Sequence, residues 1–443
     1  MAIRAAALLC LLARRHLLAA AVDVPGSAAD VVLLQQSTLL ERAGSASVQI
    51  DPENSGMSDE ELIKEYMLEH RGMAEDAVTD AAGSWLPSMR TRTADSILQA
   101  LASLGPGPGE WSVESPAAHG VDPAVLKRDM DAHFEEPELE RDSLLIVKDG
   151  AIIYERYNES YGFTRFTAND AHSITKTCFA LLLGWATSGL LDLDAPISRY
   201  GIKSPKPYDI TTRQVLSQAL YGNQSAGEDW AYDVTGRAWL HLMNDIFVNT
   251  TRMPPSVLFR NVFQRQMGLS NVFYWDGLDR KVTTGVKGTI RDLARFGQLM
   301  LNRGHWRTKA DESAQLVPAW FMDELNKPQT RYAPHQMYSN ACYGLTVWLN
   351  PNQPRENGPC LYFSESWTHA GRRPYPDIDI LKFPAGSSLK DYTMGGTFGQ
   401  VMMVMPEQKT VAISFGNSHD QWGGHVYAGA RLARSLCASF HTC

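Results

Sequence analysis

The run from Cys178 to Leu193 is the sequence feature that most constrains how this chain can fold. It is apolar nearly all round a helical period, which predicts a helix enclosed in a core and not one lying on a surface. Such a helix needs a large domain around it. With 443 residues and a hydrophobic fraction of 44%, the chain can build one large domain plus an appendage.

Two reactive side chains, Ser173 and Lys176, stand where this helix is expected to begin. A serine hydroxyl is a poor nucleophile at neutral pH, and a lysine three residues further along a helix lies on the same face. Partial burial of the amine should lower its pKa toward the range of a useful base. The pair therefore predicts a serine hydrolase that needs no histidine. The alternative is an ordinary helix start with a solvated lysine.

The Ser-x-x-Lys pattern is short, and about one or two matches are expected by chance in a chain of this length. Residues 387–390 form a second match. We interpret that match as accidental, because Pro384, Ala385 and Gly386 predict a polar loop with no helix to hold the pair together.

Five further segments of the chain bear on how the Ser173–Lys176 pair is interpreted. Together with Ser173 and Lys176, they resemble in order the landmarks of the serine β-lactamase and penicillin-binding-protein superfamily, over roughly residues 111–443. Within it, the chain looks most like the class C β-lactamase-related branch of esterases and 6-aminohexanoate-dimer hydrolases. The segments are residues 189–196, 210–217, 266–269, 288–297 and 343–345.

The resemblance implies both a fold and a reaction. The expected fold is α+β, with an antiparallel sheet flanked by helices and a mostly helical subdomain, and the site lies where sheet and helical lobe meet. The implied reaction is hydrolysis of an ester or amide bond through an acyl-enzyme on Ser173, with Lys176 as base.

The second motif of this superfamily is Tyr-x-Asn, and its closest counterpart here is Tyr232-Asp233-Val234. The resemblance implies that Tyr232 relays protons between the serine and the leaving group. Val234 cannot supply the side-chain amide of the family pattern, which argues against amide and lactam recognition more than against the role of the tyrosine. The alternative for Tyr232 is a core aromatic whose hydroxyl reaches the surface.

The third motif corresponds to Met394-Gly395-Gly396-Thr397, which the resemblance places on the opposite wall of the site. Glycines let a backbone N–H approach a ligand closely, so the amides of Ser173 and Thr397 could form an oxyanion hole. Met394 replaces the family's basic residue and predicts an uncharged ester or amide substrate, or a degenerate site. A glycine-rich turn into an edge strand is the purely structural alternative.

Two other functions remain open at this point. The departures at Val234 and Met394 are compatible with a binding or assembly protein that has lost catalysis. A true β-lactamase or D-Ala-D-Ala peptidase is disfavoured, because Met394 offers no partner for the substrate carboxylate.

The expected partner is a small-molecule ester or amide. We expect no nucleic acid, since the formal charge is −8 with no basic stripe, and no metal or cofactor, since no His or Cys pair has ligand spacing.

The N-terminal region differs from the rest of the chain. Residues 1–22 carry three arginines and no acid around a short apolar core, which predicts a secretory signal peptide, with a mitochondrial transit peptide as the alternative. Sequons at Asn158, Asn223 and Asn249 favour a secreted glycoprotein. The core is too short to span a bilayer, so we expect no integral membrane segment in the mature chain.

Residues 23–109 are predicted to form an N-terminal extension that ends in the Gly/Pro linker 105–109, and residues 110–443 to form the hydrolase domain. Within the domain, local patterns predict several elements. They are a helix starting at Asp122 and Pro123, a hairpin of residues 144–147 and 151–154, a helix over 289–303, strands over 401–404 and 410–415, and a closing helix over 427–439.

Overall fold

The structure is a computed structural model, and it describes a large part of the unit Arg92–Cys443. The described residues are 103–137, 139–186, 191–206, 208–218, 240–276, 281–309, 312–329, 343–350, 352, 383–384, 386–417 and 424–441. The predictions for the targeting segment and most of the extension, for Tyr232 and for the sequon at Asn223 therefore lie outside the described residues. The sequon residue Asn249 is described, and its Nδ2 donates a hydrogen bond to the Tyr200 carbonyl.

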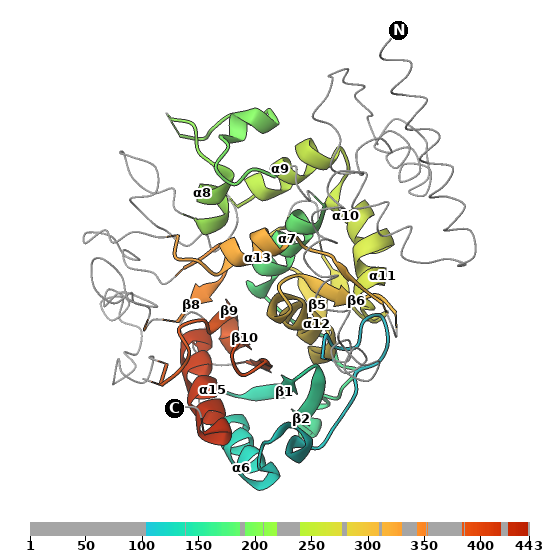
Figure 1. The fold of residues 1–443 in the computed structure, drawn as a ribbon, viewed down its shortest axis with the longest axis vertical. Helices are drawn as coiled ribbons and strands as arrows, with labels where there is room; N and C mark the ends of the chain where they lie inside the picture. Colours follow the sequence, from blue (N-terminus) through green and yellow to red (C-terminus); the bar gives the residue numbers. More distant parts are fainter. Residues whose placement is uncertain are drawn as a thin grey trace, which may run out of the picture. The chain divides into compact units, whose positions relative to one another are not determined.

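A six-stranded antiparallel sheet forms the framework of this unit (Figure 1). The strand from the start of the domain, β1, pairs with β11 from its end, so both ends of the domain meet in the middle of the sheet. The order is β2 (Ala151–Tyr157), β1 (Arg141–Lys148), β11 (Thr410–Gly416), β10 (Gln400–Met405), β9 (Tyr392–Gly396) and β8 (Trp348–Leu349).

The β1–β2 hairpin closes through a two-residue turn, as predicted. Lys148 pairs with Ala151, and both turn residues have positive φ, 49° at Asp149 and 86° at Gly150. Positive φ at both central positions defines a type I′ turn, whose twist matches that of the flanking strands. The predicted strands over 401–404 and 410–415 are also confirmed, as β10 and β11.

Helices cover both faces of the sheet. On one face, α6 (Pro123–Phe134) and α15 (Gly424–Phe440) pack together over a core of strand side chains such as Ile146 and Met403. On the other face lies α12 (Ile290–Leu301). A Cβ at Gly297 of α12 would come within 2.5 Å of Val411, so only glycine allows this helix to lie so close to β11.

The three predicted helices are confirmed in α6, α12 and α15, and their capping explains two of the boundaries. The Asp122 side chain accepts hydrogen bonds from the amides of Ala124 and Val125 and so begins α6. Thr289 and Asp292 form a reciprocal capping box at the start of α12. The helix ends at Leu301, two residues before the predicted position.

Shorter elements make up the rest of the unit, and together with the sheet they confirm the predicted α+β fold. Figure 1 shows most of the helices among them gathered beyond the edge of the sheet, around α7. They are α7 (Ile174–Ala186), α8 (Thr212–Ser217), α9 (Leu242–Thr251), α10 (Pro255–Leu258), the short π-helix η4 (Phe259–Phe263), α11 (Gln264–Met267) and α13 (Ala319–Leu325). Two small sheets, β3 (Asn169–Asp170), β5 (Val286–Gly288) and β4 (Tyr274–Trp275) in one and β6 (His305–Arg307) and β7 (Ser313–Gln315) in the other, accompany them.

Helix α7 lies between the six-stranded sheet and the group of shorter helices. All 13 of its residues are buried, as the apolar pattern predicts, and it packs against α9 on one side and against β9 and β10 on the other. Its Cys178 is a free thiol with no exposed surface, and burial raises the pKa of that thiol, so it behaves as a small apolar group.

The Gly/Pro run 105–109 lies against the domain. Arg295 of α12 donates hydrogen bonds to the carbonyls of Gly107 and Gly109, and Arg307 donates one to Pro106. This backbone is therefore fixed by two buried or half-buried guanidinium groups.

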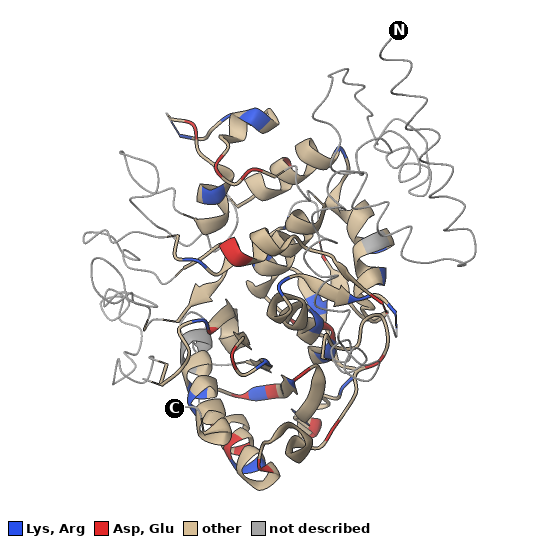
Figure 2. Cartoon of the chain, in the orientation of Figure 1, with Lys and Arg blue, Asp and Glu red and all other residues tan. Residues whose placement is uncertain are grey.

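Acidic and basic residues are interspersed along the described elements (Figure 2).

Asp391, just before β9, is a buried carboxylate for which the described part of the chain provides no counter-ion. It is 1% exposed, and neither of its side-chain oxygens has a hydrogen-bond partner. Desolvation by burial, reinforced by the negative charge of Glu407, raises the pKa of Asp391 from its ordinary 3.8 to about 7. The folded protein therefore binds a proton that the unfolded chain releases, and stability is lost as the pH rises from about 4 through 7.

We predict that Asp391→Asn stabilises the protein at pH 8, by on the order of 1 to 3 kcal/mol, and changes its stability much less at pH 4. Thermal unfolding at both pH values measures this difference. The wild-type protein at the same two pH values is the reference. Equal effects of Asp391→Asn at the two pH values would contradict the assignment.

Candidate active site

Ser173 and Lys176 lie together at the N-terminus of α7. Lys176 Nζ is 2.8 Å from Ser173 Oγ, within hydrogen-bonding distance. The lysine side chain is 1% exposed and the serine residue 7%, so both groups are largely withdrawn from water. The backbone amide of Lys176 also donates to the carbonyl of Ser173, which tightens this first turn. The structure thus joins the two residues that the sequence analysis paired.

Hydrogen bonds on both sides hold the first turn of α7 in place. The Thr175 hydroxyl accepts from the amide of Val286 in β5, and the Thr177 hydroxyl donates to the carbonyl of Thr346. The amide of Ala171, just before the helix, donates to the Val286 carbonyl. Because these contacts come from two distant segments, the position of Ser173 is fixed by tertiary structure and not by the helix alone.

The end of β9 packs directly against the residues that precede Ser173. A Cβ added to Gly396 would lie 2.7 Å from the carbonyl oxygen of Ala171 and 3.1 Å from Cβ of His172. Only glycine permits this approach. The Gly395-Gly396-Thr397 segment and the start of α7 are therefore adjacent walls, as the resemblance implies.

Two residues beside these walls adopt backbone conformations that non-glycine residues rarely take. His172 has φ of 45° and Phe398 has φ of 65°, and their rings lie 5.2 Å apart. One precedes Ser173 and the other follows Thr397. Strain of this kind persists only where surrounding packing determines it, and it is common at functional sites.

The remaining predicted residues are placed as follows. Met394 is 1% exposed and points into the protein interior from β9, and Gly395 is buried beside it. In the second Ser-x-x-Lys match, the Ser387 hydroxyl donates to Pro384, while the exposed Lys390 forms an ion pair with Glu407. Ser387 and Lys390 therefore contact different partners, which supports the interpretation of the second match as accidental.

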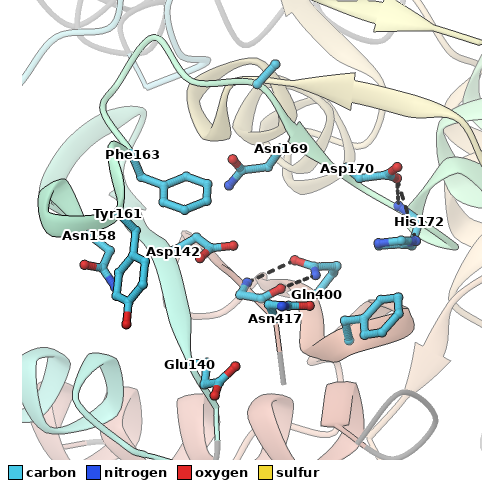
Figure 3. A pocket seen from close by; sticks show the side chains of 13 residues that line it. Glu140, Asp142, Asn158, Tyr161, Phe163, Asn169, Asp170, His172, Gln400 and Asn417 are labelled. Carbon is cyan, nitrogen blue, oxygen red and sulfur yellow. Dashed lines mark hydrogen bonds and ion pairs between the residues drawn. The ribbon is translucent and has the colours of Figure 1, made fainter. Parts of the chain in front are cut away.

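A pocket of about 650 Å³ lies next to this site, and no sequence pattern pointed to it. It sits where β2 ends, β1 and β10 begin and β11 ends, and Figure 3 shows His172 at one side of it. Phe398, which follows Thr397 in the chain, is also part of the lining. The other lining residues are Glu140, Asp142, Asn158, Tyr161, Phe163, Ala168, Asn169, Asp170, Gln400, Gly416 and Asn417. These positions are spread over 278 residues of the sequence, from 140 to 417, so no local motif could have identified them.

Two further findings concern the described part of the chain. No three His, Cys, Asp or Glu side chains there are arranged to hold a metal ion. Of the helices in the same part, none combines the length and apolar character needed for a bilayer span.

Comparison with known proteins identifies the family. The family model described as Beta-lactamase matches residues 131–433, which include every element named above from β1 to β11. The chain therefore belongs to the β-lactamase family, and the predicted superfamily is confirmed. Membership supports a hydrolase activity in general. No curated protein matches the chain.

Several solved structures resemble this chain at low identity, and the first of these, with a TM-score above 0.5, shows the same fold. A penicillin-binding-protein homologue from Caulobacter crescentus is 11% identical, with a TM-score of 0.52, over 71% of this chain and 97% of that one. A β-lactamase from Mycobacterium bovis is 14% identical, with a TM-score of 0.49, over 71% and 100%. A Bacillus anthracis protein assigned as a 6-aminohexanoate-dimer hydrolase is 16% identical, with a TM-score of 0.46, over 67% and 79%.

We predict that Gly396→Ala destabilises the protein by about 1 to 3 kcal/mol, because the new methyl group would push β9 away from the start of α7. Denaturant unfolding measures the change. Gly429→Ala in α15 is the matched control, since its Cβ would meet Val401 at an ordinary 3.4 Å and alanine favours the helix. Equal losses in the two variants would show that the close approach at Gly396 has no special role.

Proposed function

We propose that this protein is a serine hydrolase that cleaves uncharged esters, and less readily amides, through an acyl-enzyme on Ser173. The observation that carries the proposal is the position of the buried Lys176 Nζ, 2.8 Å from Ser173 Oγ. Burial disfavours the ammonium form of a lysine relative to the neutral amine. A neutral amine at this distance can accept the hydroxyl proton.

The reaction proceeds in two steps. Ser173 Oγ attacks the substrate carbonyl carbon while Lys176 takes its proton, and the backbone amides of Ser173 and Thr397 stabilise the oxyanion. Tyr232 relays the proton to the departing alcohol or amine. Water then attacks the acyl-enzyme by the reverse proton path and releases the acid. The approach of Gly396 to Ala171 supports the pairing of these two walls.

Two sequence features support an uncharged ester as the substrate. The buried side chain of Met394 provides no charge for a substrate carboxylate, so a β-lactam or a D-Ala-D-Ala peptide would lack its usual anchor. Val234 cannot hold an amide carbonyl as an asparagine would. The resemblance to the esterase branch of the family points the same way.

The second candidate is a binding or assembly protein that has lost catalysis, and the same departures at Val234 and Met394 favour it. A fluorophosphonate probe followed by mass spectrometry separates the two proposals. An active enzyme labels on Ser173, whereas a binding protein leaves Ser173 unlabelled.

We predict that Ser173→Ala and Lys176→Met each lower the turnover of p-nitrophenyl butyrate by on the order of 10⁴-fold, because each removes an essential member of the pair. Both variants should stay folded, since a buried lysine replaced by an apolar chain of similar shape is tolerated. Initial rates and thermal unfolding test both statements.

The matched control is Lys390→Met, which alters the second Ser-x-x-Lys match at an exposed site. Its turnover should equal that of the wild type. Undiminished hydrolysis by folded Ser173→Ala would end the proposal.

A further inference from the structure

A buried arginine, Arg141, stands at the start of β1 and has no role in the reaction steps proposed above. It is 1% exposed, and burial lowers the pKa of its guanidinium to about 9, which leaves the group charged at neutral pH. A charged group in a protein core must have its hydrogen bonds satisfied there. The acceptors that Arg141 uses therefore show which parts of the structure it holds together.

The guanidinium of Arg141 joins three separate segments. Its Nε and Nη2 donate to the carbonyl of Leu139, in the loop before β1, and its Nη1 donates to the Ser414 hydroxyl of β11. Nη1 also donates to the carbonyl of Gly399, at 2.7 Å. Hydrogen bonds from a charged donor are shorter and stronger than those between neutral groups. Gly399 is therefore firmly tied to the start of β1.

The sheet is built to accommodate this side chain. The register of β1 on β11 shifts between Arg141 and Ser143, so Asp142 is an extra residue in β1. A bulge of this kind redirects the side chains beside it. Gly416 of β11 leaves room for the guanidinium, because a Cβ there would lie 2.6 Å from Cζ of Arg141. The bulge and the glycine are two independent features that serve the same contact.

Gly399 matters because it ends the short 3-10 turn η6 (Thr397–Gly399), which directly follows β9. The first residue of η6 provides one of the two amides proposed to hold the oxyanion. Its middle residue, Phe398, has φ of 65°, which a phenylalanine adopts only where its surroundings impose it. The His172 ring packs against Phe398, and the bond from Arg141 holds the residue after it.

The neighbouring strands have a separate connection that does not involve Arg141. Gln400, the first residue of β10, donates from Nε2 to the carbonyl of Gly416 and accepts at Oε1 from the Gly416 amide (Figure 3). This pair of bonds joins β10 to β11 just beyond η6. Loss of Arg141 should therefore loosen the η6 turn without separating the two strands.

We propose that Arg141 is a positioning residue for the acyl transfer. By holding the Gly399 carbonyl, it fixes the η6 turn that presents the Thr397 amide to the oxyanion, while its own buried guanidinium stays away from the substrate. This inference rests on the proposed function for the role of the Thr397 amide. A misaligned oxyanion donor stabilises the transition state less but changes substrate binding little, so kcat falls and KM is nearly constant.

Arg141→Met tests this role, because methionine occupies much of the same space and has no donor. Its kcat for p-nitrophenyl butyrate should fall on the order of 100-fold, with KM within about twofold of the wild-type value. Arg295→Met is the matched control. Arg295 is also buried and donates to three backbone carbonyls, none of them in η6, so its loss should lower stability and leave kcat unchanged. Equal losses of kcat in the two variants would overturn the proposal.

Arg141→Lys provides the same test if Arg141→Met does not fold. Lysine keeps the charge, but its ammonium group cannot reproduce the planar fork that bonds Leu139 and Gly399 together. Its kcat should fall about tenfold at nearly constant KM. Folded Arg141→Lys with the kcat of the wild type would overturn the proposal.

A readout that needs no catalysis separates this inference from the proposed function. In protein labelled with 4-fluorophenylalanine, the fluorine NMR signal of Phe398 is assigned from its loss in Phe398→Leu. Arg141→Met should shift or broaden this signal, and Arg295→Met should not. If the wild type cleaves no ester but the signal responds in this way, the proposed function fails and the control of η6 by Arg141 stands. If the wild type cleaves esters and folded Arg141→Met keeps its kcat, the positioning role is wrong and the hydrolase stands.

Discussion

The site depends on a lysine held out of water at the first turn of a helix that has no exposed face. Lys176 lies in this position because α7 is apolar on all sides and must be enclosed by the sheet and the helical lobe. Enclosure brings the amine and the Ser173 hydroxyl to 2.8 Å in a medium that disfavours charge. Packing and the proposed chemistry therefore have the same origin.

Close backbone approaches build the rest of the site around that helix. Gly396 allows the end of β9 to contact the residues before Ser173. Gly297 allows α12 to pack closely against β10 and β11 of the sheet. His172 and Phe398, both with positive φ, lie against each other between the catalytic pair and the neighbouring pocket.

Local patterns predicted much of the fold and the central pair. The apolar period placed the helix after Ser173, the Asp149-Gly150 turn placed the hairpin, and capping residues placed α6 and α12, because each of these signals acts over a few residues. The pocket could not be predicted in this way. Its carboxylates and Asn169 come from separate strand ends, and only the tertiary fold brings them to one cavity.

The protonation state of Lys176 tests the central claim most directly. Carbon NMR of lysine labelled at the ε position, with the Lys176 signal assigned from its loss in Lys176→Met, follows the amine through a pH titration. The account predicts a pKa well below the ordinary lysine value of about 10.4. A Lys176 signal that titrates together with the exposed lysines would show that the amine is fully charged at neutral pH, and would contradict the account.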